Sequence, residues 1–244
     1  MKVLLFSLSL LSCLSFSIDA TAQKPNEVGQ SISKLSFIRP GGPTLSDLSN
    51  FGKINRTEGT PYMSDTYIPA RIRFEGQPNY SEELEVLMDL EKNELFVKLS
   101  TGFTGFFPLG YLDAVELKPS AGEFLYFETL DLNELFGQGD EGRRFYRVLH
   151  RGEDYLVLHQ PIKYLRREDY IENLGMVRRP DKYLDRNQYW VFDGTTLYEI
   201  KSNLRQISKV FPAQAAAMKR LVRDNELNLE NPTHLGRLFA LLEE

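Results

Sequence analysis

Cysteine is almost absent from this chain: the only one is Cys13, in the apolar N-terminal segment. If that segment is removed, no thiol remains, which excludes disulfide bonds, thiolate catalysis and cysteine-based zinc sites. The remaining chain must then be stabilised by burial alone. Residues 23–244 are numerous enough for one good hydrophobic core or two small ones.

Histidine and the common catalytic motifs are also scarce. The three histidines are His150, His159 and His234. In the strand pairing predicted below, His159 lies opposite Arg144 and on the order of 20 Å from His150, too far to share an ion. No His-Glu-x-x-His, calcium-loop or Gly-x-Ser-x-Gly motif occurs. We therefore expect no metal ligand, no cofactor and no catalytic residue, although a scattered triad or a serine–lysine pair stays open.

No excess of positive charge is present. The chain has 29 basic and 34 acidic residues, a formal net charge of -5 and a pI near 5.4. This balance argues against a nucleic-acid partner. The fractions of hydrophobic residues, 42%, and charged residues, 26%, are those of an ordinary globular protein.

The N-terminus has the pattern of a cleaved signal peptide. Lys2 precedes an apolar stretch, Val3 to Ile18, and Ala20-Thr21-Ala22 supplies the small-x-small pattern of a cleavage site. Asp19 ends the stretch before it reaches the roughly 20 apolar residues of a membrane span. We therefore expect residues 1–22 to be removed, leaving an exported, periplasmic or extracellular protein without an integral membrane segment.

A lipid anchor is the alternative for the same segment. Leu10-Leu11-Ser12-Cys13 has the rough shape of a lipid-attachment box, which would tether Cys13 to a membrane. The apolar region would then be unusually short, and Leu11 is larger than the residue usual at its position. We favour the cleaved signal. After it, residues 23–57 are rich in Ser, Gly, Pro and Asn and predict a flexible arm.

Three hairpins follow within an antiparallel β domain expected over residues 58–201. The first turns at Lys92-Asn93, and its alternating residues place Met88 opposite Val97 with all apolar side chains on one face. The second turns at Arg151-Gly152 and is apolar on both faces, as expected for central strands. The third turns at Asp193-Gly194, setting Tyr189 opposite Tyr198 and Trp190 opposite Leu197.

Further short strands are predicted over 68–74, 114–118 and 124–127. Six or more strands in about 130 residues indicate an antiparallel roll, sandwich or open barrel. From Ser202 the apolar spacing becomes helical. Ser202 is the expected cap of a first helix, residues 213–225 form a second, and Asn231-Pro232 begins a third. We expect residues 202–244 to cover one face of the sheet, which defines an α+β protein.

Four segments in this order carry a resemblance to a known group of proteins. They are Gly59-Thr60-Pro61-Tyr62, the strand Phe145 to His150, Tyr189 to Gly194, and Ile207 to Pro212 with its helical tail. The chain resembles, over roughly residues 59–244, a group of uncharacterised exported bacterial proteins. The resemblance implies an extracytoplasmic bacterial location, and it implies no activity and no functional residue.

Aromatic residues provide the candidate ligand-binding site. Tyr189, Trp190 and Tyr198 cluster on the third hairpin, where exposed rings would bind a sugar or peptide. Alternation places Trp190 on one face and the two tyrosines on the other, so one set is expected to be core. The Gly-rich aromatic segment 101–107 predicts either a recognition loop or a kinked strand.

Two charged regions are further candidate sites. The acidic stripe on the first hairpin has a spacing that glycosidase carboxylates allow, but a solvated strand face explains it better. It comprises Glu83, Glu85, Asp89 and Glu91. In the connection 163–186, seven basic residues alternate with five acidic ones, which predicts a salt-laced surface loop. Contact of this loop with anionic envelope components is the alternative.

These observations favour an exported cell-envelope protein with a non-enzymatic binding or structural role. Its partner would be an envelope protein or a glycan. The alternative is a hydrolase acting on envelope polysaccharide or peptide, which would need a concave pocket with two carboxylates beside aromatic rings. A third possibility is a component of a larger surface complex, which predicts an uncovered apolar patch of several hundred Å².

Overall fold

The computed structural model describes residues 57–99, 104–119, 124–139, 142–167, 169–171, 176–179 and 181–244. The predicted signal peptide, Cys13 and nearly all of the predicted arm lie outside these ranges. Among the described residues, no helix has the length and apolar character that a bilayer span requires.

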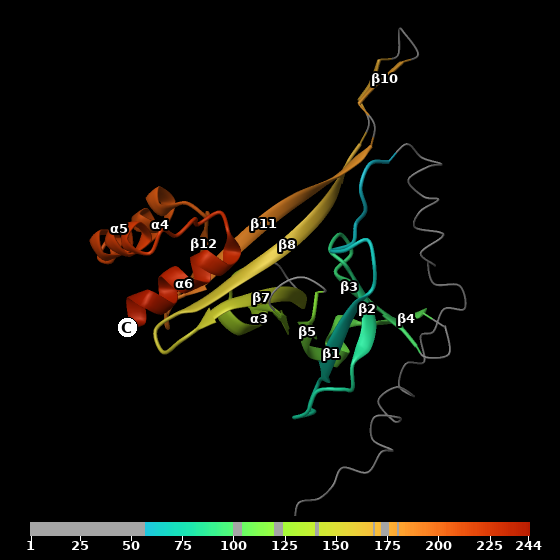
Figure 1. The fold of residues 1–244 in the computed structure, drawn as a ribbon, viewed down its shortest axis with the longest axis horizontal. Coiled ribbons are helices and arrows are strands. Elements are labelled where there is room, and N and C mark those ends of the chain that lie inside the picture. Colours follow the sequence, from blue (N-terminus) through green and yellow to red (C-terminus); the bar gives the residue numbers. More distant parts are fainter. Residues whose placement is uncertain are drawn as a thin grey trace, which may run out of the picture.

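The described elements are mostly strands, with three helices at the C-terminal end (Figure 1). The strands are β1 Ile68–Phe74, β2 Leu84–Asp89, β3 Glu94–Lys98, β4 Thr104–Phe107, β5 Leu112–Leu117, β6 Leu125–Leu130, β7 Arg144–Arg151, β8 Leu156–Arg166, β9 Asp169–Ile171, β10 Met176–Arg179, β11 Lys182–Phe192 and β12 Leu197–Ile200. The helices are the 3-10 turn η1 Leu109–Tyr111 and the α-helices α3 Leu132–Phe136, α4 Leu204–Val210, α5 Ala215–Asp224 and α6 Pro232–Glu243.

Ten strands form one open antiparallel sheet in the order β12-β11-β8-β7-β6-β5-β1-β2-β3-β4, and β9 pairs with β10 separately. The predicted α+β class is confirmed. Helix α6 begins as predicted, because the Asn231 side chain accepts a hydrogen bond from Thr233 N and Pro232 occupies the first turn. The cap of α4 is Asn203, whose side chain accepts from Gln206 N, so the predicted cap Ser202 was one residue early.

One face of the sheet, called the inner face here, carries two hydrophobic cores. Over β1 to β7 the sheet curls on itself, so that side chains such as Ile72, Val86, Leu95 and Phe127 pack together and are at most 1% exposed. Val86, Met88 and Val97 point into this core, as the alternation predicted.

Over β8, β11 and β12 the inner face is covered by the C-terminal helices. Val157, Val191 and Ile200 from the strands pack against helical residues such as Ile207 and Phe239. Figure 1 shows α4, α5 and α6 gathered at this end of the sheet. The amphipathic stripes of the tail are therefore buried on the strands, as expected from their spacing.

The opposite, outer face has a smaller core beneath α3. Leu132 of this helix packs with Tyr146, Leu158 and Leu197, which are all buried. Helix α3 was not among the elements expected from the sequence. Its signals are local: the Asp131 carboxylate accepts from Glu134 N, and Gly137 ends the helix in the left-handed region at φ 66°.

All three predicted hairpins exist, but their turns have four residues instead of two. The first places Met88 opposite Leu95, the second places Arg151 opposite Leu156, and the third places Tyr189 opposite Ile200. The predicted pairs at these hairpins were therefore wrong. At the first and third hairpins every pair moved by two residues, so their side chains stay on the predicted faces.

Carboxylates hold each of the three turns in its longer form. In the first turn Asp89 Oδ1 accepts from the amides of Glu91 and Lys92, both at 2.9 Å. In the third, Asp193 Oδ1 accepts from the amides of Thr195 at 3.0 Å and Thr196 at 2.8 Å. In a two-residue turn, these amides would pair across the two strands. In the longer turn they lose that pairing, and the aspartate side chains accept their hydrogen bonds instead.

The second turn is held by Glu243, from the last turn of α6. Its Oε1 accepts from the amides of Asp154 and Tyr155, both at 2.8 Å, and its Oε2 lies 2.7 Å from His150 Nε2. Burial pushes the pKa of Glu243 upward, but the two amides and His150 outweigh it and lower the pKa below its ordinary value. Glu243 therefore fastens the helical layer to the β7–β8 hairpin as a carboxylate.

We expect the Glu243→Gln variant to be less stable than the wild type by about 1–2 kcal/mol at pH 7, because the amide replaces two charge-assisted acceptors. Because folding lowers the pKa of Glu243, the stabilisation by its carboxylate is complete above the pKa of the unfolded state. It is lost as the pH falls through the lower pKa of the folded state. Urea unfolding of both proteins should therefore show a difference that narrows between pH 7 and pH 3.5. A difference that stays constant with pH would contradict this role.

Candidate functional site

A row of directly paired residues crosses seven strands on the inner face and defines the candidate site. It is apolar at both ends and polar in the middle. From β1 to β12 the row reads Ile72, Val115, Phe127, Arg147, His159, Tyr189 and Ile200. Arg147 and His159 thus lie where the curled β core meets the helix-covered core.

His159 is held neutral at this junction. The side chain is buried, its ring stacks on Tyr189 with centroids 4.9 Å apart, and its Nε2 lies 2.8 Å from Asn187 Oδ1. Burial lowers the pKa of His159 to about 4, the Asn187 hydrogen bond opposes this shift, and the positive charge of Arg147 adds to it. At neutral pH the imidazole is therefore uncharged.

The hydrogen bond to Asn187 also fixes the tautomer of His159. A carboxamide oxygen only accepts hydrogen bonds, so Nε2 carries the proton and Nδ1 presents a lone pair. Nδ1 is buried and has no hydrogen-bond partner within the described part of the chain. The junction therefore contains a buried acceptor that a hydroxyl or N–H donor would satisfy.

Arg147 ties the sheet to the helical layer. Its Nη2 donates to Thr233 Oγ1, in the first turn of α6, at 3.1 Å. The two residues are far apart in sequence, and this contact helps to hold α6 along β7. Arg147 as a whole is partly buried, and its positive charge borders the inner face at its centre.

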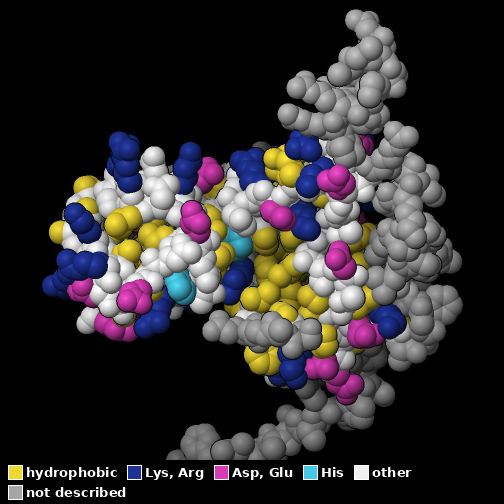
Figure 2. Space-filling view, turned by 45° about the horizontal axis from the view of Figure 1, so that its top comes forward, with side chains coloured by type: hydrophobic (Ala, Val, Ile, Leu, Met, Phe, Trp, Pro, Cys, Tyr) yellow, Lys and Arg dark blue, Asp and Glu magenta, His cyan; other side chains and the backbone are white. Residues whose placement is uncertain are grey.

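Beside this polar centre the inner face is apolar, and the described residues cover it only in part. A second row of paired positions reads Leu84, Ala70, Leu117 and Leu125. Ala70 and Leu117 are buried, whereas Leu84 and Leu125 at the two ends are only partly buried. Figure 2 shows hydrophobic side chains gathered in a hollow between the helical lobe and the curled β half. We call this region the inner hollow.

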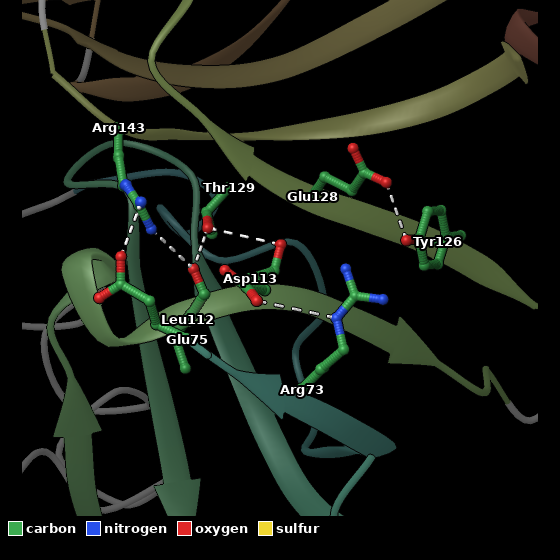
Figure 3. A network of polar contacts seen from close by, with 8 residues as sticks. All are labelled: Arg73, Glu75, Leu112, Asp113, Tyr126, Glu128, Thr129 and Arg143. Carbon is green, nitrogen blue, oxygen red and sulfur yellow. Dashed lines mark hydrogen bonds and ion pairs between the residues drawn. The ribbon is translucent and has the colours of Figure 1, made fainter. Parts of the chain in front are cut away.

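The outer face of β1, β5 and β6 carries a polar network instead (Figure 3). Arg73 Nε lies 3.9 Å from Asp113, and Tyr126 Oη donates to Glu128 at 2.9 Å. Arg143 Nη2 donates to Glu75 at 2.9 Å, and its Nη1 donates to the Leu112 carbonyl at 3.4 Å. These contacts join neighbouring strands and the loops at their ends.

Two further carboxylate contacts complete the outer network. Glu116 forms an ion pair with Arg71, and Glu128 accepts from Arg151 Nη2 at 2.6 Å. The guanidinium groups of Arg71 and Arg73 lie 5.5 and 5.7 Å from the ring centroid of Tyr80. Burial, followed by the hydrogen bond to Glu128, raises the pKa of Tyr126, so this phenol remains protonated and donates.

The three aromatic candidates from the sequence do not form one surface. Tyr189 is buried under His159, and Tyr198 packs against Phe211 of the tail with ring centroids 5.4 Å apart. Trp190 lies on the outer face in the core beneath α3. The pair expected between Tyr189 and Tyr198 is replaced by Tyr189 with Ile200 and Val191 with Tyr198.

Two other sequence expectations require correction. The acidic stripe is not uniformly solvated: Glu83 and Glu85 are exposed, but Asp89 is buried because its carboxylate binds the turn amides. His159 lies opposite Arg147, not Arg144, since the turn is longer and β7 has a bulge near Leu149. His150 and His159 are therefore closer along the strands than predicted, about 10 Å.

His150 binds Glu243 and His159 binds Asn187, so the two histidines have separate partners. No group of three or more metal-ligating side chains occurs among the described residues. In the segment 101–107, residues 104–107 form the edge strand β4, and residues 101–103 lie outside the described ranges.

Comparisons with family models, curated proteins and solved structures found no match for this chain.

Proposed function

We propose that this protein is an exported cell-envelope protein with a non-enzymatic binding role, and that the inner hollow receives the apolar part of its ligand. The export part of the proposal rests on residues 1–22, which lie outside the described ranges. The binding part rests on the inner face.

The observation that carries the proposal is the half-covered apolar row that ends beside a polar centre. Ligand sites in proteins are concave and mostly apolar, with a few placed polar groups that orient the ligand. Leu84 and Leu125 supply the apolar wall, and Leu125 lies diagonally across from Arg147 in the strand register, about 7–8 Å away. His159 adds an unsatisfied acceptor in the same region.

The outer carboxylates favour a binding role over the hydrolase alternative. Glu116 and Glu128 are diagonal neighbours on β5 and β6, a spacing within the range of glycosidase acids. However, each is ion-paired with an arginine. Both carboxylates therefore bridge neighbouring strands, β5 to β1 and β6 to β7, and are already bound by guanidinium groups where a substrate would have to meet them.

Binding of the apolar fluorophore N-phenyl-1-naphthylamine tests the proposal. A Leu125→Trp variant should fill the hollow and weaken probe affinity at least tenfold. The matched control is Leu135→Trp, since Leu135 is 57% exposed on α3, on the other face of the sheet. The control should bind the probe as the wild type does, and thermal unfolding should show that both variants fold.

Two results would overturn the proposed site. One is a wild-type protein that does not bind the probe. The other is a pair of folded variants that lose probe affinity equally, because binding would then occur outside the inner hollow.

A further inference from the structure

Strands β8 and β11 extend well beyond their neighbours as a two-stranded ribbon. They pair with each other along their full length, but β7 accompanies β8 only as far as His159, and β12 accompanies β11 only from Tyr189. Residues 160–166 and 182–188 therefore form the ribbon, which projects from the body toward β9 and β10 (Figure 1). The loop predicted for this region was wrong, because most of its described charged residues lie on strands β8, β9, β10 and β11.

The inner face of the ribbon is charge-balanced and braced. Lys163 lies opposite Asp185, with its Nζ 3.8 Å from the carboxylate. Tyr183 Oη donates to Glu91 Oε2, in the β2–β3 turn, at 3.0 Å. This face therefore has its partners within the chain.

The outer face of the ribbon is neither charge-balanced nor braced in this way. Its outermost three cross-strand pairs are Arg166 with Lys182, Tyr164 with Leu184, and Ile162 with Arg186. These six residues include three cations and no acid. Like charges directly opposite each other destabilise a sheet, and Arg166 faces Lys182 in this way.

Among the described residues, an acidic side chain pairs with one of these three cations. Lys182 forms an ion pair with Glu58 at 3.0 Å, whereas no described residue forms an ion pair with Arg166 or Arg186. The Nε of Arg166 is buried without a partner. Between the cations, the ring of Tyr164 is 45% exposed.

We propose that the outer face of the ribbon docks on the surface of an anionic lipid bilayer. Arg166, Lys182 and Arg186 would bind lipid phosphates and acidic headgroups, and Tyr164 with Leu184 would enter the interfacial layer. Tyrosine and long cationic side chains are the residues that membrane interfaces favour. The three cations and the exposed ring share one face of the ribbon, whereas an extended peptide would bind along a strand edge.

Co-sedimentation with lipid vesicles tests this inference on the full mature chain. Vesicles of phosphatidylglycerol mixed with phosphatidylethanolamine should bind the protein at low salt, and pure phosphatidylcholine vesicles should not. Since each cation near an anionic surface contributes about 1 kcal/mol, about fivefold in partition, the Arg166→Glu/Arg186→Glu variant should bind at least tenfold more weakly. Tyr164→Ser should also weaken binding, by about threefold or more.

The control is Lys219→Glu/Arg220→Glu, which makes the same charge change on two exposed residues of α5. It should bind the anionic vesicles within twofold of the wild type. The inference fails if the two double variants bind equally, if the wild type does not bind anionic vesicles, or if the ribbon selects an acidic protein while vesicles stay unbound. The naphthylamine affinity of the ribbon variant should be unchanged, so this test is independent of the inner hollow.

Discussion

A Gly236→Ala variant is expected to be less stable than the wild type by about 2 kcal/mol or more. Gly236 lies in the middle of α6, where the helix crosses β7. A Cβ at this position would overlap the carbonyl oxygen of Leu149 and stand 2.9 Å from its carbonyl carbon and its Cβ. Backbone atoms cannot yield as a flexible side chain does, so α6 must move off the sheet.

The sign of this result is diagnostic. In a helix without the close approach, alanine would stabilise by about 1 kcal/mol relative to glycine. Chemical denaturation of both proteins measures the difference. Gly110→Ala is the control, because no atom lies within 4 Å of a Cβ built there, and its stability should be close to that of the wild type. A stabilised Gly236→Ala protein would show that α6 does not pack against Leu149.

The stability of the protein is expected to fall by about 2 kcal/mol between pH 7.5 and pH 5 because of His159 alone. Its pKa is lowered from 6.5 to about 4 by burial. Over this interval the unfolded chain binds a proton on His159 that the folded protein does not bind. Stability therefore falls as pH decreases, and the contribution is complete only above the unfolded-state pKa.

A His159→Gln variant isolates this contribution. Glutamine can donate a hydrogen bond to Asn187 but has no group that titrates in this range. Between pH 7.5 and pH 5, the unfolding free energy of the variant should therefore fall by about 2 kcal/mol less than that of the wild type. Urea titrations at the two pH values provide the measurement. His150 and His234 are present in both proteins and serve as an internal reference. Parallel pH profiles would mean that His159 is protonated in the folded state and the junction is open to water.

The local signals in the sequence predicted the elements well. Residues 68–74 form β1 over the predicted range, and Asn231 and Pro232 begin α6 as expected. These features depend on alternation and capping within a few neighbouring residues, which the sequence contains directly. The face of the sheet on which each side chain lies was also predicted correctly at the first and third hairpins, because a register shift of two residues keeps side chains on the same face.

Registers could not be predicted because the deciding contacts are made by side chains in folded turns. Asp89 and Asp193 lie next to their turns, where an aspartate can accept hydrogen bonds from turn amides. This signal indicates a longer turn than the two-residue turn that was predicted. For the second turn no local signal exists. Its amides are bound by Glu243, from the far end of the chain.

The polar centre of the inner face was missed for a related reason. The sequence presents His159 only as a metal ligand shared with His150, and no motif marks Arg147. Their adjacency depends on the bulge in β7, and their partners Asn187 and Thr233 come from β11 and α6. The available clue was that the polar residues His159 and Gln160 directly follow the apolar run Leu156 to Leu158.

By itself the sequence determined most of the strands, the three C-terminal helices, the α+β class and most of the side chains that face inward, because periodicity and capping act over a few residues. Only the tertiary structure decided the turn lengths, the inner hollow beside Arg147 and His159, and the unequal faces of the β8–β11 ribbon. Each of these depends on contacts between residues far apart along the chain. Such contacts exist only after the sheet has curled and the helices have packed on it.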